Sequence, residues 1–329
     1  MAVVHGAAPL LTVTTRERGW PSIAEPGDRS SAPWILGRPI KSGDDGGFDA
    51  LPDDVRMPHG NRAIDLFLPP FEDSTMTGHL IVTDEDATRV IKLRRPEKKN
   101  AFTQDMYRGM SDAIDKAQNN PDIRCIIITG GSGVFTAGND LEDFLKESTS
   151  NTDMPRAASN AVKLLYSLAH NVKPIIAAVD GVAIGIGTTM LFHCDYVLAS
   201  TTATFSTPFI HLGLVPEGAS SLLMPRTMGH QRAFAMLVMG RKFSAEEAHT
   251  AGFVNVVVAP GHTEAEARKV AREICALPAE AVAISRKLLK LPPEDMTRRI
   301  DQEGHLFGER MRSKEAVAAF KAFFARKKG

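Results

Sequence analysis

The sequence predicts an α/β protein with a mostly parallel sheet. Two apolar, β-branched runs, Cys125–Thr129 and Ile175–Val179, are typical of buried strands. Apolar residues between and around these runs recur at helical spacing, so strands alternate with helices along the chain. The chain has 329 residues and is 43% hydrophobic, which is enough for one substantial core. Helical crossovers between strands favour parallel pairing.

The first repeat of strand and helix is predicted between residues 79 and 129. Residues 79–83 and Thr88–Leu93 form two short strands around an acidic turn, which indicates a hairpin. A helix should follow Thr103, a plausible N-cap. Its predicted core face carries Met106, Met110, Ala113, Ile114 and Ala117. The strand Cys125–Thr129 then completes the unit.

Later segments repeat this order and end in helices. A helix over residues 159–169 leads into the strand Ile175–Val179, a small-residue turn at 181–187 opens another helix, and residues 196–199 return as a strand. Beyond Phe243 the chain is predicted to be mainly helical. The expected helices cover residues 263–276, 279–289, 295–311 and 315–326. The last is apolar enough to need a partner surface, as in helical tails that bury against another subunit.

Three regions follow from these patterns. Residues 1–75 are rich in Pro and Gly and lack apolar periodicity, so they are predicted to be an irregular or disordered arm. The arm could also lie upstream of a natural start at Met76, or act as a docking or regulatory extension. Residues 76–265 form the predicted α/β core, and residues 266–329 the C-terminal helical region.

Composition excludes several classes of protein. Basic and acidic residues balance at 39 each, which disfavours a nucleic-acid partner. No apolar run approaches the roughly 20 residues that span a bilayer, so no membrane association is predicted. The N-terminus lacks a secretory pattern, and the expected location is cytoplasmic. Cys125, Cys194 and Cys275 lie too far apart in sequence for a ligand or redox pair, so no disulfide is assigned.

Two glycine turns are candidates for binding chemistry. Residues 135–140 follow the strand Cys125–Thr129, and residues 180–187 follow Ile175–Val179. Glycines allow a close approach of the backbone, and a helix starting near Gly185 would add its positive end. Two such turns at neighbouring strand ends could hold one oxygen as an oxyanion hole. A dinucleotide fingerprint, a phosphate-binding loop and a serine nucleophile elbow are all absent from the sequence.

Glu217 is the first candidate for a catalytic base. It is the one ionisable carboxylate in an apolar or small run on a turn made by Pro216 and Gly218. A poorly solvated carboxylate has a raised proton affinity, which suits proton transfer. The alternative is that Glu217 caps the helix expected from Ala219. The run at residues 193–195 (His-Cys-Asp) is interpreted as packing and capping.

Three motifs in order identify a family resemblance. They are Arg95-Pro-Glu-Lys-Lys-Asn-Ala-Phe102, Phe135-Thr-Ala-Gly-Asn-Asp140 and Gly181-Val-Ala-Ile-Gly-Ile-Gly187. Together residues 78–329 resemble the enoyl-CoA hydratase/isomerase (crotonase) superfamily. The resemblance implies a crotonase-like spiral of ββα repeats and a C-terminal helical region that joins homotrimers or hexamers. It also implies an acyl-CoA thioester as substrate.

The resemblance assigns site residues position by position. The oxyanion donors would be the backbone amides of Asn139 and Ile186. Lys98 and Asn100 stand where the family holds CoA, although Lys98 could instead be a surface charge. The remaining predicted substrate-binding residues are Ala137, Gly138, Asp140, Leu141 and Gly185. No metal and no cofactor are implied, since coenzyme A is part of the substrate.

The acids distinguish branches of the family. Hydratases of the family have two glutamates at positions that correspond here to Thr189 and Phe209, and neither can exchange a proton. The placement of Glu217 resembles the Δ3,Δ2-enoyl-CoA isomerase branch, whose members use a single glutamate for this step of fatty-acid oxidation. A hydratase that uses Glu217 or Asp140, and a catalytically silent acyl-CoA-binding homologue, are the alternatives.

Overall fold

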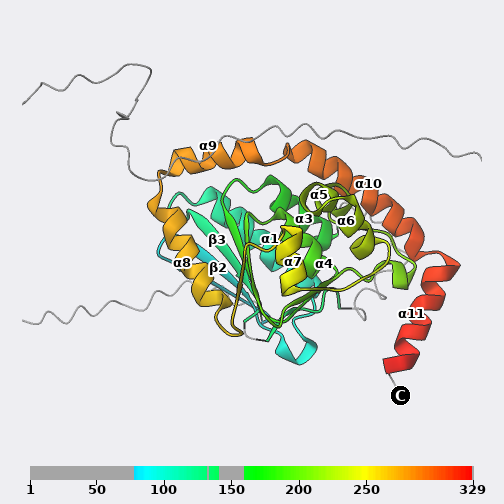
Figure 1. Ribbon diagram of the computed structural model, residues 1–329. Helices are drawn as coiled ribbons and strands as arrows, with labels where there is room; N and C mark the ends of the chain where they lie inside the picture. Colours follow the sequence, from blue (N-terminus) through cyan, green and yellow to red (C-terminus); the bar gives the residue numbers. More distant parts are fainter. Residues whose placement is uncertain (1–77, 132, 141–158, 328–329) are drawn as a thin grey trace, which may run out of the picture. The chain divides into compact units, whose positions relative to one another are not determined.

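A six-stranded sheet forms the frame of the protein (Figure 1). Its order is β1-β2-β3-β5-β7-β10. The strands are β1 (Leu80–Glu85), β2 (Thr88–Leu93), β3 (Cys125–Thr129), β5 (Ile175–Val179), β7 (Tyr196–Ser200) and β10 (Val256–Val258). β1 and β2 pair as an antiparallel hairpin, and every other pair is parallel. The predicted hairpin and the mostly parallel sheet are confirmed.

The computed structural model describes residues 78–131, 133–140 and 159–327. The predicted arm at residues 1–75 lies outside these ranges. The described residues all belong to one compact unit, in which the predicted core and the C-terminal helical region pack together. The predicted boundary after residue 265 falls inside a helix, α8 (Thr263–Ala276). No helix in the described ranges is both long and apolar enough to cross a membrane.

Helices cover both faces of the sheet. Ile126 and Ile128 of β3 point into a core shared with α1 (Gln104–Asn119) and α3 (Asn160–His170). The alternate residue Ile127 faces α8 on the opposite side. All five residues of β3 are buried, which explains its continuous apolar run. Each fully buried isoleucine stabilises the fold by about 1.5–3 kcal/mol relative to exposure.

Local sequence sets where these helices begin. The Thr103 side chain accepts a hydrogen bond from the Met106 amide at 3.3 Å, which is the predicted N-cap of α1. Ser159 caps α3 in the same way through the Val162 amide, also at 3.3 Å. The predicted helices after residue 263 correspond to α8, α9 (Ala279–Leu289), α10 (Pro293–Met311) and α11 (Lys314–Lys327).

A smaller second sheet, which the sequence did not predict, lies beside the first. Its order is β4-β6-β8-β9, with β4, β6 and β8 parallel. The strands are β4 (Val134–Thr136), β6 (Val182–Ile184), β8 (Thr204–Ser206) and β9 (Phe243–Ser244). Strands β3, β5 and β7 each turn directly into a strand of the second sheet before the next helix. This repetition is the predicted spiral of ββα units.

The turns between the sheets stack closely. A Cβ atom on Gly181, after β5, would lie only 2.0 Å from the Gly133 carbonyl oxygen, before β4. Gly181 also has a left-handed φ of 78°, which favours glycine. The backbone of one repeat therefore rests directly on the backbone of the repeat before it.

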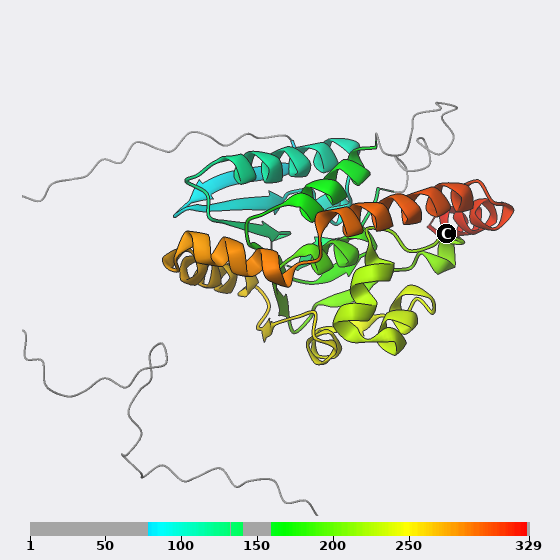
Figure 2. The same cartoon turned by 90° about the horizontal axis from the view of Figure 1, so that it is seen from above.

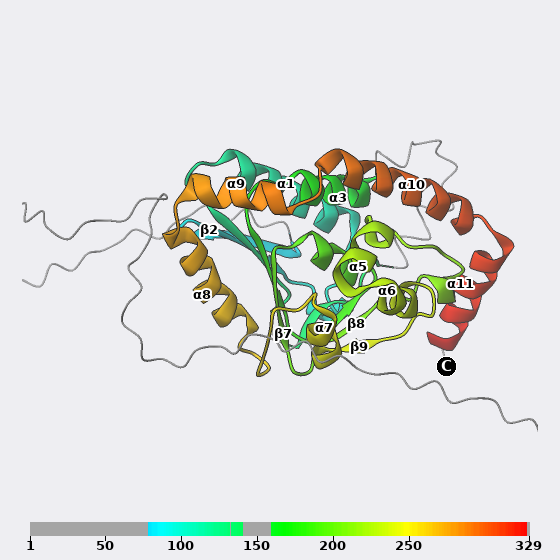
Figure 3. The same ribbon diagram turned by 45° about the horizontal axis from the view of Figure 1, so that its top comes forward.

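After α8, helices α9 and α10 run along the side of the sheet that carries α1 and α3 (Figures 2 and 3). α10 packs on α3, and α11 turns back onto the short 3-10 helix η4 (Ile210–Leu212). A Cβ atom on Gly213 would lie 2.9 Å from the Ala316 amide nitrogen, so this contact is close. The other helical segments in the described part of the chain are η1 (Pro96–Lys98), α4 (Ile186–Thr189), η3 (Met190–His193), α5 (Ser220–Met228), α6 (His230–Leu237) and α7 (Ala245–Ala251).

Gly181→Ala should destabilise the protein more than Gly261→Ala. Both glycines have φ near 80°, so each alanine incurs the left-handed penalty of about 1–2 kcal/mol. Only the alanine at 181 also meets a neighbouring backbone, whereas a Cβ at 261 meets open space. We expect the free energy of unfolding, measured by urea denaturation, to fall by about 1–3 kcal/mol more in Gly181→Ala than in Gly261→Ala. Equal losses in the two variants would contradict the close stacking of the turns.

Candidate active site

The two glycine turns lie side by side. Gly138 has a φ of 83°, and a Cβ atom there would lie 2.7 Å from the Ile184 carbonyl oxygen and 3.9 Å from the Gly185 Cα. Gly187 is equally close to the first turn, because its Cβ would lie 2.4 Å from Thr136 Cγ2. Larger residues at these positions would force the turns apart.

Each turn presents a backbone amide with no acceptor among the described residues. Phe102 and the first turn form a parallel bridge that uses the Gly138 carbonyl and the Asp140 amide, at 2.8 and 3.0 Å. The intervening Asn139 amide donates to no described group. Ile186 is the first residue of α4, and its amide likewise has no acceptor in the described ranges. A helix-start amide such as that of Ile186 is suited to negative charge.

The side chains around Asn139 are held by their neighbours. The Tyr107 hydroxyl, buried on α1, donates to the Asn139 side-chain oxygen. Arg95 Nη1 lies 2.7 Å from Asp140 Oδ2 in an ion pair that is nearly buried. Arg95 also donates to the Ala101 carbonyl at 2.9 Å. Asp140 is therefore engaged in an ion pair within the protein, which disfavours it as the base of a hydratase.

Asn100 has an internal role that its sequence context does not reveal. It is buried, and its Nδ2 donates to the carbonyls of Gly130, Val134 and Phe135 at 3.0–3.2 Å. Its Oδ1 accepts from the Arg95 amide at 2.7 Å. These bonds fasten the segment that leads into the first glycine turn. The Asn100 side chain thus supports the turn, and its contact with a ligand stays a prediction.

The other predicted binding residues occupy different environments. Lys98 is exposed at the end of η1. Ala137 is half-buried, and its amide donates to the Lys99 carbonyl at 2.9 Å. Leu141 lies outside the described residues. Ligand contacts of these residues stay predictions.

Glu217 lies against the second turn. Its side chain is half-buried, and Oε1 accepts a hydrogen bond from Thr189 Oγ1 at 2.6 Å. Thr189 ends α4, three residues after Ile186, and residues three apart on a helix lie about 5–6 Å from each other. The carboxylate is therefore bonded to the last residue of the short helix whose first residue is Ile186.

The helix-cap alternative for Glu217 is wrong. At the start of α5, the amides of Ala219 and Ser221 donate to the carboxylate of Glu303, at 2.6 and 2.9 Å. Glu303 belongs to α10 and is only 5% exposed. Burial raises the pKa of Glu303, whereas the hydrogen bonds from Ser221 and Ala219 and the charge of Arg299 oppose this rise.

A sequence signal for Glu303 existed. The buried residues of α10 recur at helical spacing as Met296, Ile300, Glu303 and Phe307. A carboxylate within an otherwise apolar stripe requires a polar partner, because buried charges are normally paired or hydrogen-bonded. The stripe does not identify that partner. One of the partners is the Ala219 amide, which lies 84 residues earlier in the sequence.

His193 holds the turn from another side. The ring is fully buried, and its Nε2 lies 2.8 Å from the Gly218 carbonyl oxygen. Burial lowers the pKa of His193 to about 4, with the nearby Lys290 adding to the effect. The ring is therefore neutral near pH 7, and Nε2 carries the hydrogen that it donates to Gly218. The predicted packing role of this residue includes a specific contact with the turn at residues 216–221, called here the Glu217 turn.

An apolar ring lies beside the second glycine turn. A Cβ atom on Gly185 would lie 3.8 Å from Phe209 Cε1. Phe209 is buried, and its ring packs edge-on against Phe307 of α10 with centroids 6.1 Å apart. The position that the resemblance assigns to a second hydratase glutamate is thus occupied by a hydrocarbon surface.

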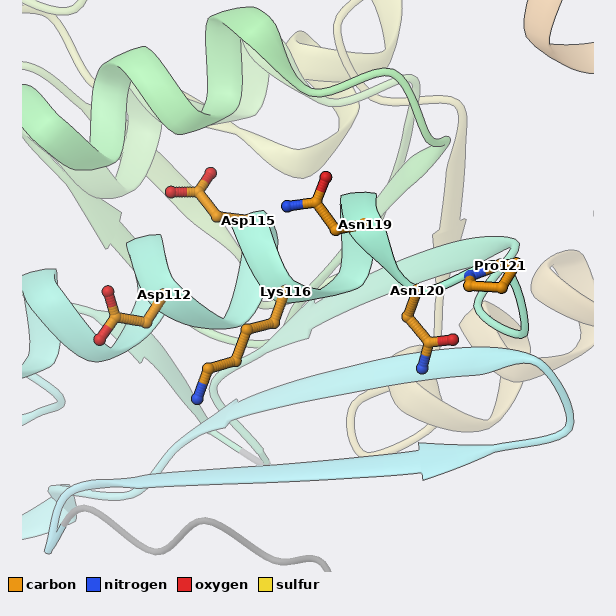
Figure 4. Close-up of a pocket in the computed structure, with 6 residues that line it drawn as sticks. All are labelled: Asp112, Asp115, Lys116, Asn119, Asn120 and Pro121. Carbon is orange, nitrogen blue, oxygen red and sulfur yellow. The ribbon is translucent and has the colours of Figure 1, made fainter.

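A separate hollow lies beside α1 (Figure 4). It is lined by Asp112, Asp115, Lys116, Asn119, Asn120 and Pro121. Neither glycine turn and no residue of the Glu217 turn lines it, so it is distinct from the candidate site. Within the described ranges, no group of three or more His, Cys, Asp or Glu side chains could hold a metal ion.

Burial of neutral His193 should make stability pH-dependent. Its pKa of about 4 lies below the ordinary 6.5, so its contribution is present above pH 6.5 and is lost as pH falls toward 4. Between pH 7 and pH 5 this loss amounts to about 2 kcal/mol. We expect the non-titrating variant His193→Gln to lack this part of the decline, measured by urea denaturation. The exposed-site control His230→Gln should retain it, and an unchanged decline in His193→Gln would contradict the assignment.

Comparison with known proteins places this geometry in a family. Residues 83–329 match the model of the enoyl-CoA hydratase/isomerase family. Human enoyl-CoA delta isomerase 2 is 34% identical over 270 residues, which cover 78% of this chain and 66% of the human protein. The 1,2-epoxyphenylacetyl-CoA isomerase of Escherichia coli is 30% identical over 72% of this chain and 93% of its own length. The solved structure of Pseudomonas aeruginosa OdaA superposes with a TM-score of 0.71 at 40% identity, covering 75% of this chain and 99% of that one. The chain therefore belongs to the enoyl-CoA hydratase/isomerase family, the crotonase superfamily that its motifs resemble.

Proposed function

We propose that this chain is a Δ3,Δ2-enoyl-CoA isomerase that uses Glu217 as its single proton shuttle. The hydrogen bond of 2.6 Å between Thr189 and Glu217 is the observation that carries this proposal. It ties one carboxylate to the last residue of α4, the short helix that begins at Ile186. Similarity to human enoyl-CoA delta isomerase 2 supports the same reaction.

The proposed reaction moves one proton across an allylic system. The thioester oxygen of a 3-enoyl-CoA accepts hydrogen bonds from the Asn139 and Ile186 amides. Glu217 removes a proton from C2, and the electrons of that C–H bond form a dienolate whose charge reaches the thioester oxygen. The protonated Glu217 returns the proton to C4, which leaves the double bond between C2 and C3. Each oxyanion donor stabilises the charged intermediate by about 3–4 kcal/mol.

Thr189 suits both protonation states of Glu217. A hydroxyl can donate one hydrogen bond and accept others. Its Oγ1 lies 2.6 Å from Glu217 Oε1 and 3.5 Å from the Ile186 carbonyl oxygen. It can donate to the carboxylate before the proton transfer. Afterwards it can turn its hydrogen toward Ile186 and accept from the carboxylic acid.

The alternatives receive less support from the site. A hydratase must activate water and protonate the α-carbon, which its relatives do with two glutamates. Here those two positions hold Thr189 and Phe209, neither of which is an acid. Asp140, the other carboxylate considered for this role, is paired with Arg95. A silent acyl-CoA-binding homologue would bind CoA without turnover, so the 3-enoyl-CoA assay distinguishes it from an isomerase.

We also propose an acyl-CoA thioester as substrate, with no metal or redox cofactor, and assembly as a homotrimer or hexamer. The apolar side chains of Ile284, Leu288 and Leu289 on α9 support assembly, since they are 53%, 81% and 88% exposed in the single chain. Exposed apolar groups of this extent on one helix favour burial against a partner surface.

Glu217→Gln should abolish most isomerase turnover, because the amide keeps the shape of the side chain but cannot take the proton. With a 3-enoyl-CoA substrate, we expect kcat to fall by about 10²–10⁴-fold, followed as conjugated absorbance. Affinity for CoA should be unchanged, and the exposed control Glu273→Gln should behave like the native protein. Undiminished turnover would exclude Glu217 as the base. A 3-hydroxyacyl-CoA product would indicate a hydratase, and CoA binding without turnover a silent homologue.

Thr189→Val should lower kcat while leaving the fold intact, since valine has nearly the same shape and Thr189 is fully buried. Loss of a hydrogen bond to a charged group costs about 1.5–3 kcal/mol, so we expect a decrease of about 10- to 100-fold. The control Thr227→Val removes an exposed hydroxyl that bonds the Leu223 carbonyl, and it should leave kcat unchanged. A native kcat in Thr189→Val would show that the hydroxyl does not support the shuttle.

A further inference from the structure

We propose that Glu303 of α10 is a positioning residue that holds the Glu217 turn in its active geometry. This inference rests on the proposed role of Glu217 as the base. Glu303 is 86 residues from Glu217 in sequence. The Glu303 carboxylate bonds the backbone amides of Ala219 and Ser221, which lie two and four residues after Glu217.

The turn needs external support because of its backbone conformation. Gly218 has a φ of 72° and Ala219 a φ of 58°, so two consecutive residues are left-handed. Alanine is disfavoured in this region, because its Cβ crowds the following carbonyl oxygen. Ala219 is also the N-cap of α5, and it has no side-chain acceptor for the first amides of that helix. Local sequence therefore does not stabilise this turn by itself.

Glu303 supplies the missing acceptors. One oxygen, Oε2, accepts from the Ala219 amide at 2.6 Å, and the other, Oε1, accepts from the Ser221 amide at 2.9 Å. The carboxylate is 5% exposed, so water competes little for these bonds. Its negative charge also faces the positive end of α5. Both amides are thus fixed to a side chain of the C-terminal helical region.

Other elements hold the same turn from different sides. Thr189 of α4 bonds the Glu217 carboxylate, and His193 of η3 bonds the Gly218 carbonyl. Arg299, one turn before Glu303 on α10, donates to Ser221 Oγ at 3.1 Å. Residues 217, 218, 219 and 221 are therefore each bonded to α4, η3 or α10. Loss of the α10 anchor would free the backbone on one side of the base while the Thr189 bond remains.

Substitution of Glu303 tests this role through turnover. Glu303→Gln keeps the shape but places an amide group against one of two backbone amides, so one hydrogen bond is replaced by a donor–donor contact. We expect kcat for 3-enoyl-CoA to fall by about 10- to 100-fold with KM within about 3-fold, because a misplaced base affects chemistry more than binding. Glu303→Asp retains both acceptors on a shorter stem and should recover part of kcat. Glu309→Gln, an exposed glutamate on the same helix, is the matched control and should have native kcat.

Hydrogen exchange tests the inference without any substrate. In Glu303→Gln, the amides of Ala219 and Ser221 should exchange at least about 10-fold faster than in the native protein, while amides of β3 keep their native rates. A variant that is folded by this criterion but has native exchange at residues 219–221 would overturn the proposal. A native kcat in folded Glu303→Gln would also overturn it. If Glu303 only stabilised the fold, its substitution would lower the unfolding temperature and leave kcat unchanged.

The two readouts separate this inference from the proposed function. If the native protein does not isomerise 3-enoyl-CoA, the proposed function fails, and faster exchange at residues 219–221 in Glu303→Gln still shows that Glu303 holds the turn. If the native protein isomerises 3-enoyl-CoA but Glu303→Gln retains kcat and exchange, the positioning role fails alone.

Discussion

Close contact between two glycine turns is the constraint on which the site depends. Gly138 lies so near the Ile184 carbonyl that a Cβ atom would be 2.7 Å from it. This approach brings the Asn139 amide and the start of α4 to adjacent positions on the molecule. The spiral makes the contact possible, because β4 and β6 lie parallel and neighbouring in the second sheet. A preorganised pair of donors requires little rearrangement when charge develops on a bound oxygen.

The Glu217 turn adds a second level of organisation. Its carboxylate, a carbonyl and two amides are each bonded by a side chain from elsewhere in the fold, namely Thr189, His193 and Glu303. Two of these partners are polar groups buried at a cost, since burial lowers the pKa of His193 and raises that of Glu303. Buried polar groups of this kind stabilise one conformation when their hydrogen bonds are made. The turn is therefore specified by tertiary contacts rather than by its own residues.

The C-terminal helices connect the site to the outer surface of the protein. α10 carries Glu303 to the Glu217 turn and Phe307 to Phe209, which lies beside the second glycine turn. α9, immediately before α10, exposes Ile284, Leu288 and Leu289. The same helical region thus contacts the site and presents an apolar surface. Under the proposed assembly, burial of that surface would also restrain the helix that follows it.

By itself, the sequence determined the main sheet, the helices that cover it and the family, because burial on both faces produces apolar runs and helical burial produces 3.6-residue spacing. It also singled out Glu217 and both glycine turns through their local composition. The strands of the second sheet, two or three residues each, are too short for any period to show. Only the tertiary structure decided that Asn100 fastens a turn, that Asp140 pairs with Arg95, and that Glu303 rather than Glu217 caps α5. Each of these outcomes depends on atoms distant in sequence that come within 3 Å, or close to it, only after the chain has folded, and no local pattern encodes such a distance.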